Sequence, residues 1–389
     1  MSVHYLKTKL NIPPQRANLV LRPRLIKLLE EGEQQRNRLT LVSAKAGSGK
    51  TTLVSEWLHG QQRTAAWLSL DAGDNNSHRF ISYLIAALDE VGITVSKAIL
   101  NQLEIPQLPQ IETLFAEIIE NIAGNPLPIV IVLDDYHLIQ NEWIHKALEF
   151  LVEHQPLKLH LICITRIDPP LSLARLRARS QLSEIRDDDL RFTSEETLQF
   201  FSETMALDLP AESVAVLEER TEGWIAGLQL AAITAKGHQQ DGNLASFVKE
   251  FGGTNRFILD YLIAEVLQQQ TRGIRNFLME TAILERMCGD LCDAVRFGVE
   301  EETANSAEDD LQRRDSQVIL DELEQKNLFV MPLDDERWWY RYHHLFADLL
   351  KSTLKQHKTE GQIRALHHRA CQWHQREGNL APCLPMAPA

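Results

Sequence analysis

The stretch Leu39–Thr51, LTLVSAKAGSGKT, decides the fold of this 389-residue chain. A short apolar run leads into a glycine-containing loop, and the helical pattern that follows has its apolar positions within residues 53–58. In such a strand–loop–helix unit the glycines permit a tight loop whose backbone N–H groups surround a phosphate, and the helix N-terminus adds a favourable dipole. The phosphate-loop pattern GxxxxGK[ST] begins with glycine, whereas Ala44 stands here and fits only with a negative φ. An ordinary glycine-rich turn is the alternative, and we favour the phosphate loop.

The residues of this loop take separate roles around a nucleotide. Lys50 would reach the β- and γ-phosphates, and the hydroxyl of Thr51 would hold Mg²⁺. The other phosphate-binding candidates are Ala46, Gly47, Ser48, Gly49 and Thr52. The loop therefore predicts a site for ATP or ADP with Mg²⁺.

A second signal is a pair of carboxylates, Asp134 and Asp135, directly after the apolar run Ile129–Leu133. Side chains that end a parallel strand project over the carboxyl edge of the sheet, where the phosphate loop also lies. We assign Asp134 to the metal shell, and Asp135 to the water near the γ-phosphate as a general base or orienting group. For the pair alone, an acidic strand-to-loop turn is the alternative. Coupled to Lys50, the pair predicts the catalytic residues of an NTPase.

Arginines follow a further apolar run, Leu159–Thr165. Arg166 stands where it would sense the γ-phosphate, and a structural pairing with one of the two aspartates is nearly as well supported. Downstream, Arg175, Arg177 and Arg179 recur at two-residue spacing. They would either present an arginine to the nucleotide of a neighbouring subunit or form a solvated basic surface, which we favour.

The first half of the chain alternates apolar runs with helix-period stretches, the pattern of parallel α/β proteins. The candidate strands are Leu39–Ala44, Ala65–Leu70, Ile129–Leu133 and Leu159–Thr165. Amphipathic helices are predicted around residues 25–29 and over Trp143–Val152. The fold class is therefore an α/β P-loop NTPase domain, a parallel sheet with helices on both faces. We assign it residues 1–190, including an N-terminal arm.

After about Arg191 the strand signals fade and helices dominate. Thr193 followed by Glu196 indicates a helix start, because a hydroxyl near the N-cap and a Glu in the first turn satisfy exposed N–H groups. Further helices are predicted over Val214–Glu219, Ile225–Thr234, Phe257–Gln269 and Gly273–Leu284. This region, 191–285, is a predicted helical domain.

A third unit has the order helix, two strands, helix, which is winged-helix-like. Its elements are a helix over Val318–Leu328, strands over Phe329–Leu333 and Arg337–Tyr342, and a helix over Leu345–Leu354. We assign this unit residues 286–360. Residues 361–389 hold one more helical pattern and then an uncharged tail, Leu380–Ala389, with three prolines, which we expect to be a truncated or non-native end.

Composition excludes several classes of protein. With 40 Lys and Arg against 54 Asp and Glu, the net charge is -14, so the chain has no general attraction to nucleic-acid backbones or anionic membranes. No membrane span or signal peptide is visible, and five irregularly spaced cysteines argue against a disulfide framework, so a cytoplasmic location is expected. Cys288 and Cys292 stand four apart, but nothing completes a metal site, and we take them as core or surface thiols.

Taken together, the motifs resemble the nucleotide-binding part of MalT-like, LuxR-type ATP-dependent transcriptional regulators, members of the STAND class of signal-transduction NTPases. The resemblance runs from about Thr8 to Gly378. It rests on Leu19–Leu25, Ala44–Thr51, Trp67–Asp71 with Asp74-Asn75 and Arg79-Phe80, Asp134–His137, Leu190–Thr193, Gly223-Trp224 with Gly227–Leu230, and Tyr342–Phe346.

The resemblance implies further roles. Val20 and Arg22, which alone would be only a packed arm, look like an adenine-side clasp. The helical domain resembles a lid over the nucleotide, and the winged helix resembles one that packs on nucleotide rather than DNA. There His343, which alone would be only a capped helix start, matches a histidine that touches the β-phosphate of ADP.

The implied function is an ATP/ADP-binding switch with slow ATP hydrolysis and signal transduction as its purpose. ADP would lock a closed monomer, and ATP with Mg²⁺ would permit a homo-oligomer. Relatives continue into an inducer-binding repeat array and a DNA-binding helix-turn-helix, so we expect here only their regulatory NTPase part, without DNA binding. An engineered fragment, a natural truncation and a frameshifted gene all remain open. One alternative function is a P-loop kinase or ATPase that acts on a separate substrate. Another is DNA binding through the winged helix, which the acidic turn at residues 334–336 disfavours. A third is a truncated chain that folds but has lost all output.

Overall fold

The computed structural model of the chain describes residues 6–15, 18–60, 63–95, 109–239, 248, 251–253, 255–298 and 315–377. By internal contacts the chain divides into two compact units, Met1–Phe192 and Thr193–Ala389. The uncharged tail predicted from Leu380 lies outside the described residues.

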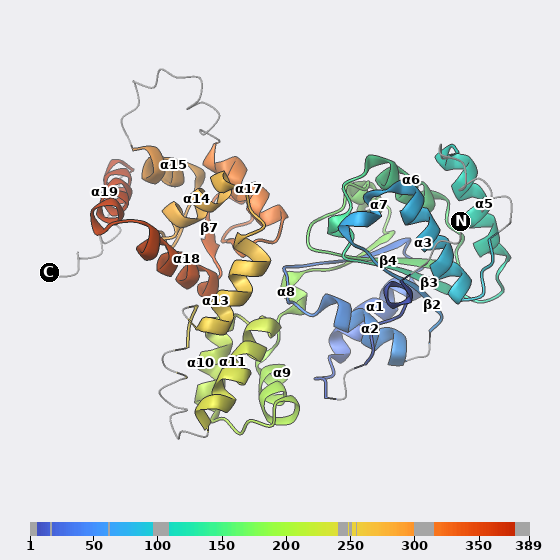
Figure 1. The fold of residues 1–389 in the computed structure, drawn as a ribbon, viewed down its shortest axis with the longest axis horizontal. Helices are drawn as coiled ribbons and strands as arrows, with labels where there is room; N and C mark the ends of the chain where they lie inside the picture. The colour runs from blue at the N-terminus through green and yellow to red at the C-terminus, as the bar shows by residue number, and fades with distance from the viewer. Residues whose placement is uncertain are drawn as a thin grey trace, which may run out of the picture. The chain divides into compact units, whose positions relative to one another are not determined.

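The first unit is built on a five-stranded parallel sheet with the strand order β2-β3-β4-β1-β5 (Figure 1). The strands are β1 (Leu39–Ser43), β2 (Ala65–Ser69), β3 (Ile129–Asp134), β4 (Leu159–Thr165) and β5 (Leu182–Ile185). The first four confirm the predicted strands. Every residue of β1, β3 and β4 is buried, as expected of continuous apolar runs that are covered on both faces.

The edge strand β5 was not predicted. It is four residues long, and only Ile185 is fully buried. Glu184 stands inside it and accepts two hydrogen bonds from Arg177, at 2.8 and 2.9 Å. A charged residue in so short a run removes the apolar signal that identifies the other strands.

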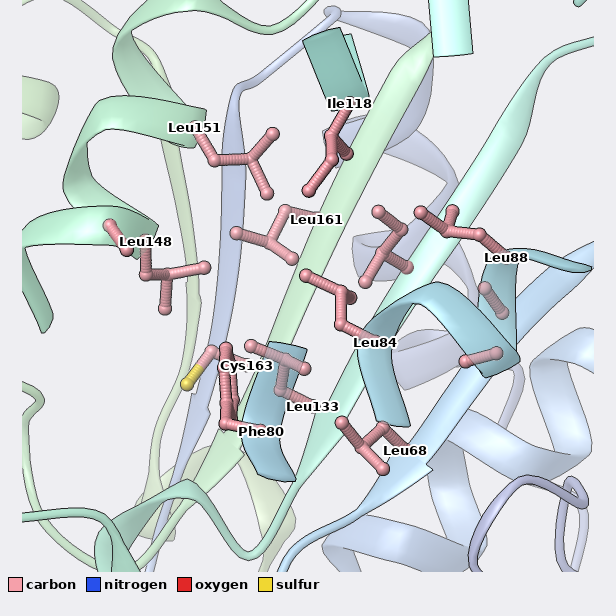
Figure 2. Close-up of a cluster of buried hydrophobic side chains, with 14 of the residues drawn as sticks. Leu68, Phe80, Leu84, Leu88, Ile118, Leu133, Leu148, Leu151, Leu161 and Cys163 are labelled. Carbon is pink, nitrogen blue, oxygen red and sulfur yellow. The ribbon is translucent and has the colours of Figure 1, made fainter. Parts of the chain in front are cut away.

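Helices cover both faces of this sheet, as predicted. They are α1 (Pro23–Gln34), α2 (Lys50–Gly60), α3 (Ser77–Glu90), α5 (Ile111–Gly124), α6 (Glu142–His154), α7 (Leu173–Ala178) and α8 (Asp187–Leu190), with short turns η1 (Lys7–Lys9), η2 (Ala72–Asn75) and η3 (Tyr136–Leu138). Successive residues of a strand point to opposite faces. Leu133 and Leu161 therefore join the cluster under α3, α5 and α6 shown in Figure 2, whereas Val132 and Ile162 join the cluster under α1 and α2.

The register of the strands determines where the site lies. β4 runs between β1 and β3, with Ser43 opposite Thr165 and Leu133 opposite Cys163. Because all three strands are parallel, their carboxyl ends meet at one edge of the sheet. The loops that follow them lie side by side there.

The second unit is largely helical and carries one β-ribbon. Its elements are α9 (Ser194–Gln199), a π-helical turn η4 (Phe200–Thr204), α10 (Ala211–Thr221), α11 (Ile225–Gln239), α13 (Arg256–Leu262), a π-helical turn η5 (Ile263–Leu267), α14 (Arg272–Thr281), α15 (Gly289–Phe297), α17 (Ser316–Gln325), β6 (Val330–Pro332), β7 (Tyr340–Tyr342), α18 (His344–His357) and α19 (Glu360–Arg376). β6 and β7 pair antiparallel between α17 and α18, which confirms the predicted helix, ribbon, helix order. Among the helices of the described residues, none has the length and apolarity needed to cross a membrane.

The start of the second unit confirms the predicted helix signal. The Thr193 hydroxyl accepts from the N–H of Glu196 at 3.2 Å, and the Glu196 carboxylate accepts from the N–H of Thr193 at 3.1 Å. This reciprocal pair is a capping box, which satisfies two N–H groups that a helix start leaves open.

Candidate functional site

The loop between β1 and α2 has the conformation that a phosphate loop needs. Gly47 and Gly49 adopt φ values of 71° and 86°, in the region that glycine enters at little cost. Ala44 is not among the residues with positive φ, so the substitution of the first glycine is accommodated. The Ser48 hydroxyl donates to the carbonyl of Lys45 at 2.8 Å and closes the loop on itself.

Lys50 begins α2 and lies under this loop. Its side chain is buried, and its Nζ donates to the carbonyls of Ala44 at 2.8 Å and Lys45 at 2.9 Å. Burial, together with the charge of Arg166, lowers the pKa of Lys50 to about 8. A buried amine of this kind gains from an anion placed in the loop, because the anion's charge offsets the cost of its desolvation.

Thr51 and Asp134 meet across the edge of the sheet. The Thr51 hydroxyl donates to Oδ1 of Asp134 at 3.0 Å, and the N–H of Asp135 donates to the same oxygen at 3.1 Å. Asp134 is only 4% exposed, and its burial and the neighbouring Asp135 raise its pKa to about 7. The structure thus places the two predicted metal-binding residues in direct contact.

Asp135 leaves the strand in an unusual conformation. Its φ of 58° and ψ of 38° lie in the left-handed region, which non-glycine residues seldom enter. The side chain is half-exposed, and its Oδ1 lies 3.8 Å from Nδ1 of His137. The sequence predicts no role of its own for His137, the last residue of the motif Asp134–His137, and the structure brings it to the site.

Arg166 follows β4 at the same edge of the sheet. Its positive charge acts on both Lys50 and His137 and lowers the pKa of each. A position beside the phosphate loop is required of a residue that senses the γ-phosphate. It is also required of a residue that pairs with Asp134 or Asp135, so both interpretations remain open.

The structure adds Lys45 and Asp187 to the site, which sequence reasoning missed. The Lys45 Nζ pairs with Oδ2 of Asp187 at 2.8 Å, and both side chains are largely buried. Asp187 begins α8, so this ion pair joins the phosphate loop to the segment that ends the first unit. The run of three aspartates at 187–189 marked the place, but its spacing to Lys45 carries no signal because the two are 142 residues apart.

The N-terminal arm contacts the same segment. Val20 is buried, and the Arg22 guanidinium donates to the carbonyls of Leu190 at 2.9 Å and Arg191 at 2.7 Å. It also lies over the ring of Phe192, 4.3 Å from its centroid. Arg22 therefore secures residues 190–192, and its predicted place beside adenine stays a prediction.

His343 lies in the second unit and is fully buried there. Its Nε2 is 2.9 Å from the carbonyl of Thr221, and its ring packs edge-on against Trp224 and Phe329. Next to it, Glu222 accepts two hydrogen bonds of 2.8 Å from Arg341. Burial alone would raise the pKa of Glu222, but these bonds outweigh it and lower that pKa to about 2.

The remaining candidates take structural places. Arg175 pairs with Glu153 and Arg177 with Glu184, which accords with the favoured surface role for these two arginines. Cys288 and Cys292 are buried, and within the described ranges no group of three or more His, Cys, Asp or Glu side chains is arranged to hold a metal.

Comparison with protein families divides the chain in the same order as the motifs. Residues 21–164 match the AAA ATPase domain, and residues 263–362 match the MalT winged helix domain. The chain thus contains a MalT-like AAA ATPase domain followed by a MalT winged-helix domain.

Curated relatives agree with this assignment. The MalT-like chain is 36% identical over 345 residues to the HTH-type transcriptional regulator MalT of Klebsiella pneumoniae subsp. pneumoniae. The aligned region covers 88% of this chain and 36% of that regulator. It is 36% identical over 368 residues to MalT of Serratia proteamaculans, covering 94% of the chain and 38% of the regulator. The chain thus spans little more than a third of these relatives.

Among solved structures, the chain is similar to a Walker-type ATPase of Pyrococcus abyssi. The TM-score is 0.55 at 14% sequence identity, and the match covers 87% of this chain and 98% of the other. A likeness at this identity concerns the fold alone.

Proposed function

We propose that this MalT-like chain is an ATP/ADP-binding switch that hydrolyses ATP slowly. The observation that carries the proposal is the contact of Thr51 with Asp134 at 3.0 Å beside the buried amine of Lys50. A structural turn has no need to bury a lysine and an aspartate at one edge of a sheet. A loop that receives a phosphate and a divalent cation needs both.

The oxygen donors at this edge fit Mg²⁺. The Thr51 hydroxyl and the Asp134 carboxylate are hard ligands, and Mg²⁺ commonly takes one or two protein oxygens with the rest from phosphates and water. The raised pKa of Asp134 reflects a buried carboxylate without a full cationic partner, which a cation would supply. When bound, Mg²⁺ would neutralise charge on the β- and γ-phosphates.

The residues of the chain divide the chemistry among them. Lys50 would exchange its bonds to two loop carbonyls for bonds to phosphate oxygens, while the N–H groups of residues 46–52 surround the phosphates. Asp135, the more exposed of the two aspartates, would accept a proton from the attacking water. As that water bonds to the γ-phosphorus, the bond to the bridging oxygen breaks and ADP leaves.

The wider role of the switch is part of the same proposal. A ligand shifts a conformational equilibrium only through different affinities for the two states, and the γ-phosphate supplies such a difference. We propose a closed ADP state that involves His343 and an ATP state that self-associates. The acidic turn between β6 and β7 supports a winged helix that does not bind DNA. That its relatives are transcriptional regulators supports a cytoplasmic location.

The nucleotide content of the purified protein tests the proposal. We expect near-stoichiometric ADP after acid release and ion-exchange separation. Lys50→Ala should lose it, whereas the exposed Lys27→Ala on α1 should keep it. An empty protein that turns over ATP rapidly, or that transfers phosphate to a small acceptor, would instead indicate an ATPase or kinase acting on a separate substrate.

A further inference from the structure

The buried ring nitrogen Nδ1 of His137 lies just too far from a carboxylate oxygen to form a hydrogen bond. Its side chain is 13% exposed, and among the described residues its Nδ1 has no hydrogen-bond partner. The nearest carboxylate oxygen is Oδ1 of Asp135, at 3.8 Å. A hydrogen bond needs a separation of about 3 Å, so a movement of less than ~1 Å would form one.

The backbone that carries His137 is held from both sides. Asn75 donates from Nδ2 to the carbonyl of Leu138 at 2.8 Å, and its Oδ1 accepts from the N–H of Gln140 at 2.6 Å. The hydroxyl of Tyr136 lies 2.8 Å from Nδ1 of His145. These bonds anchor the turn η3, whereas the Asp135 side chain is 47% exposed, so a movement that closes the gap is easier for Asp135.

The charges around His137 determine its protonation. Burial, followed by the charges of Arg166 and Lys50, lowers the pKa of His137 to about 3. The ring is therefore neutral at physiological pH and has one N–H to donate. A neutral ring can orient Asp135 through a hydrogen bond. A cationic ring would instead form an ion pair with the carboxylate, and that pairing would make the carboxylate a weaker base.

We propose that His137 is a positioning residue that donates its Nδ1–H to Oδ1 of Asp135 when ATP is bound. This rests on the proposed ATP hydrolysis. With Oδ1 held, Oδ2 faces the attacking water and takes its proton. Meanwhile the water oxygen bonds to the γ-phosphorus, and the electron pair of the breaking bond passes to the bridging oxygen of ADP. The proton then leaves Asp135 for the released inorganic phosphate.

Two substitutions at this position separate positioning from structure. His137→Phe keeps the ring volume and removes the donor, and we expect kcat for ATP to fall about tenfold to a hundredfold with an unchanged KM, as for loss of a hydrogen bond to a charged group. His137→Asn places an amide N–H near the former Nδ1, and kcat should stay within about threefold of the original. If both variants lose activity equally, or if KM rises while kcat holds, the proposal is wrong.

A matched control guards against general loss of stability. His160 is a second buried histidine, bonded to Thr40 at 3.0 Å at the opposite end of the sheet. His160→Asn should lower the midpoint of thermal unfolding without changing kcat. A fall in kcat of the same size as in His137→Phe would overturn the positioning role.

A readout without turnover separates this proposal from the proposed function. The protein is labelled with ¹⁵N at its histidines, saturated with a non-hydrolysable ATP analogue and measured by NMR. The signal of His137, identified by its loss in His137→Asn, should show a proton on Nδ1. That proton should shift in Asp135→Ala. Failure to bind the analogue at all would refute the proposed function. Binding with Nδ1 unprotonated would refute the role of His137 alone.

Discussion

Asp134→Asn should stabilise the nucleotide-free protein, and the gain should depend on pH in a way that burial dictates. The pKa of Asp134 rises from its ordinary value of 3.8 to about 7 in the folded chain. Between these values the unfolded chain has lost the proton and the folded chain keeps it, so stability falls as pH rises from 3.8 to 7 and is constant above. At 1.36 kcal/mol for each pH unit, the full penalty above pH 7 is about 4 kcal/mol.

Asparagine removes this penalty and keeps an oxygen for the bonds from Thr51 and the Asp135 N–H. Between pH 5.5 and pH 7 the stability difference between variant and original should therefore widen by about 2 kcal/mol. For a unit of this size that is a relative gain in thermal midpoint of about 5 °C. Asp134 raises the pKa of Lys50 less than Asp135 or Asp187 does, so loss of that attraction offsets only a small part.

The assay is thermal unfolding of nucleotide-stripped protein at pH 5.5, 7 and 8, with and without ATP and Mg²⁺. The exposed Asp89→Asn on α3 is the control variant, because it also replaces an aspartate by asparagine but outside the site. The original protein should gain stability from Mg·ATP, and Asp134→Asn should gain far less. If the difference between Asp134→Asn and the original is the same at all three pH values, the burial argument is refuted.

Three further predictions concern the contacts of Arg22, Arg341 and His160. Arg22→Met should lower the free energy of unfolding of the first unit by about 2 kcal/mol, because the bonds to the carbonyls of residues 190–191 are lost. A lower ATP affinity at unchanged stability would instead indicate direct contact with adenine. Arg341→Met should lower the free energy of unfolding by about 3 kcal/mol, because the buried Glu222 carboxylate loses its cationic partner. Adding Glu222→Gln should restore much of that stability, as measured by urea unfolding. Burial lowers the pKa of His160 below its ordinary value of 6.5. As pH drops below 6.5 the unfolded chain therefore takes up the proton before the folded chain does, and stability falls. His160→Gln should make this fall in stability shallower.

Much of the first unit could be predicted because its signals are local. The strands β1, β3 and β4 are continuous apolar runs, and the loop of residues 44–51 carries its chemistry in consecutive positions. The meeting of the loops after β1 and β3 at one edge then follows from the fold class, since a parallel sheet places all carboxyl ends at one edge. The contact of Thr51 with Asp134 is the direct consequence.

The residues that could not be predicted act over long separations in sequence. Asp187 pairs with Lys45 across 142 residues, and Asn75 holds the turn after β3 across 63. Neither spacing has a periodicity, and an aspartate or asparagine in a polar segment is more often a cap or a turn residue. β5 was missed for a related reason, because Glu184 is tolerated in the strand only through Arg177 and Arg186.

One segment of the first unit, residues 187–192, is held by two parts of the site, and in the proposed switch these contacts would carry a ligand signal onward. Lys45 binds Asp187, and Arg22 binds the carbonyl of Leu190, so the phosphate loop and the N-terminal arm contact one segment of six residues. That segment ends directly before Thr193, where the second unit begins. In the proposed switch, a bound phosphate that moved Lys45 would act directly on the ion pair of this residue with Asp187. On this proposal the residues that lead into the second unit would respond to the nucleotide through that ion pair.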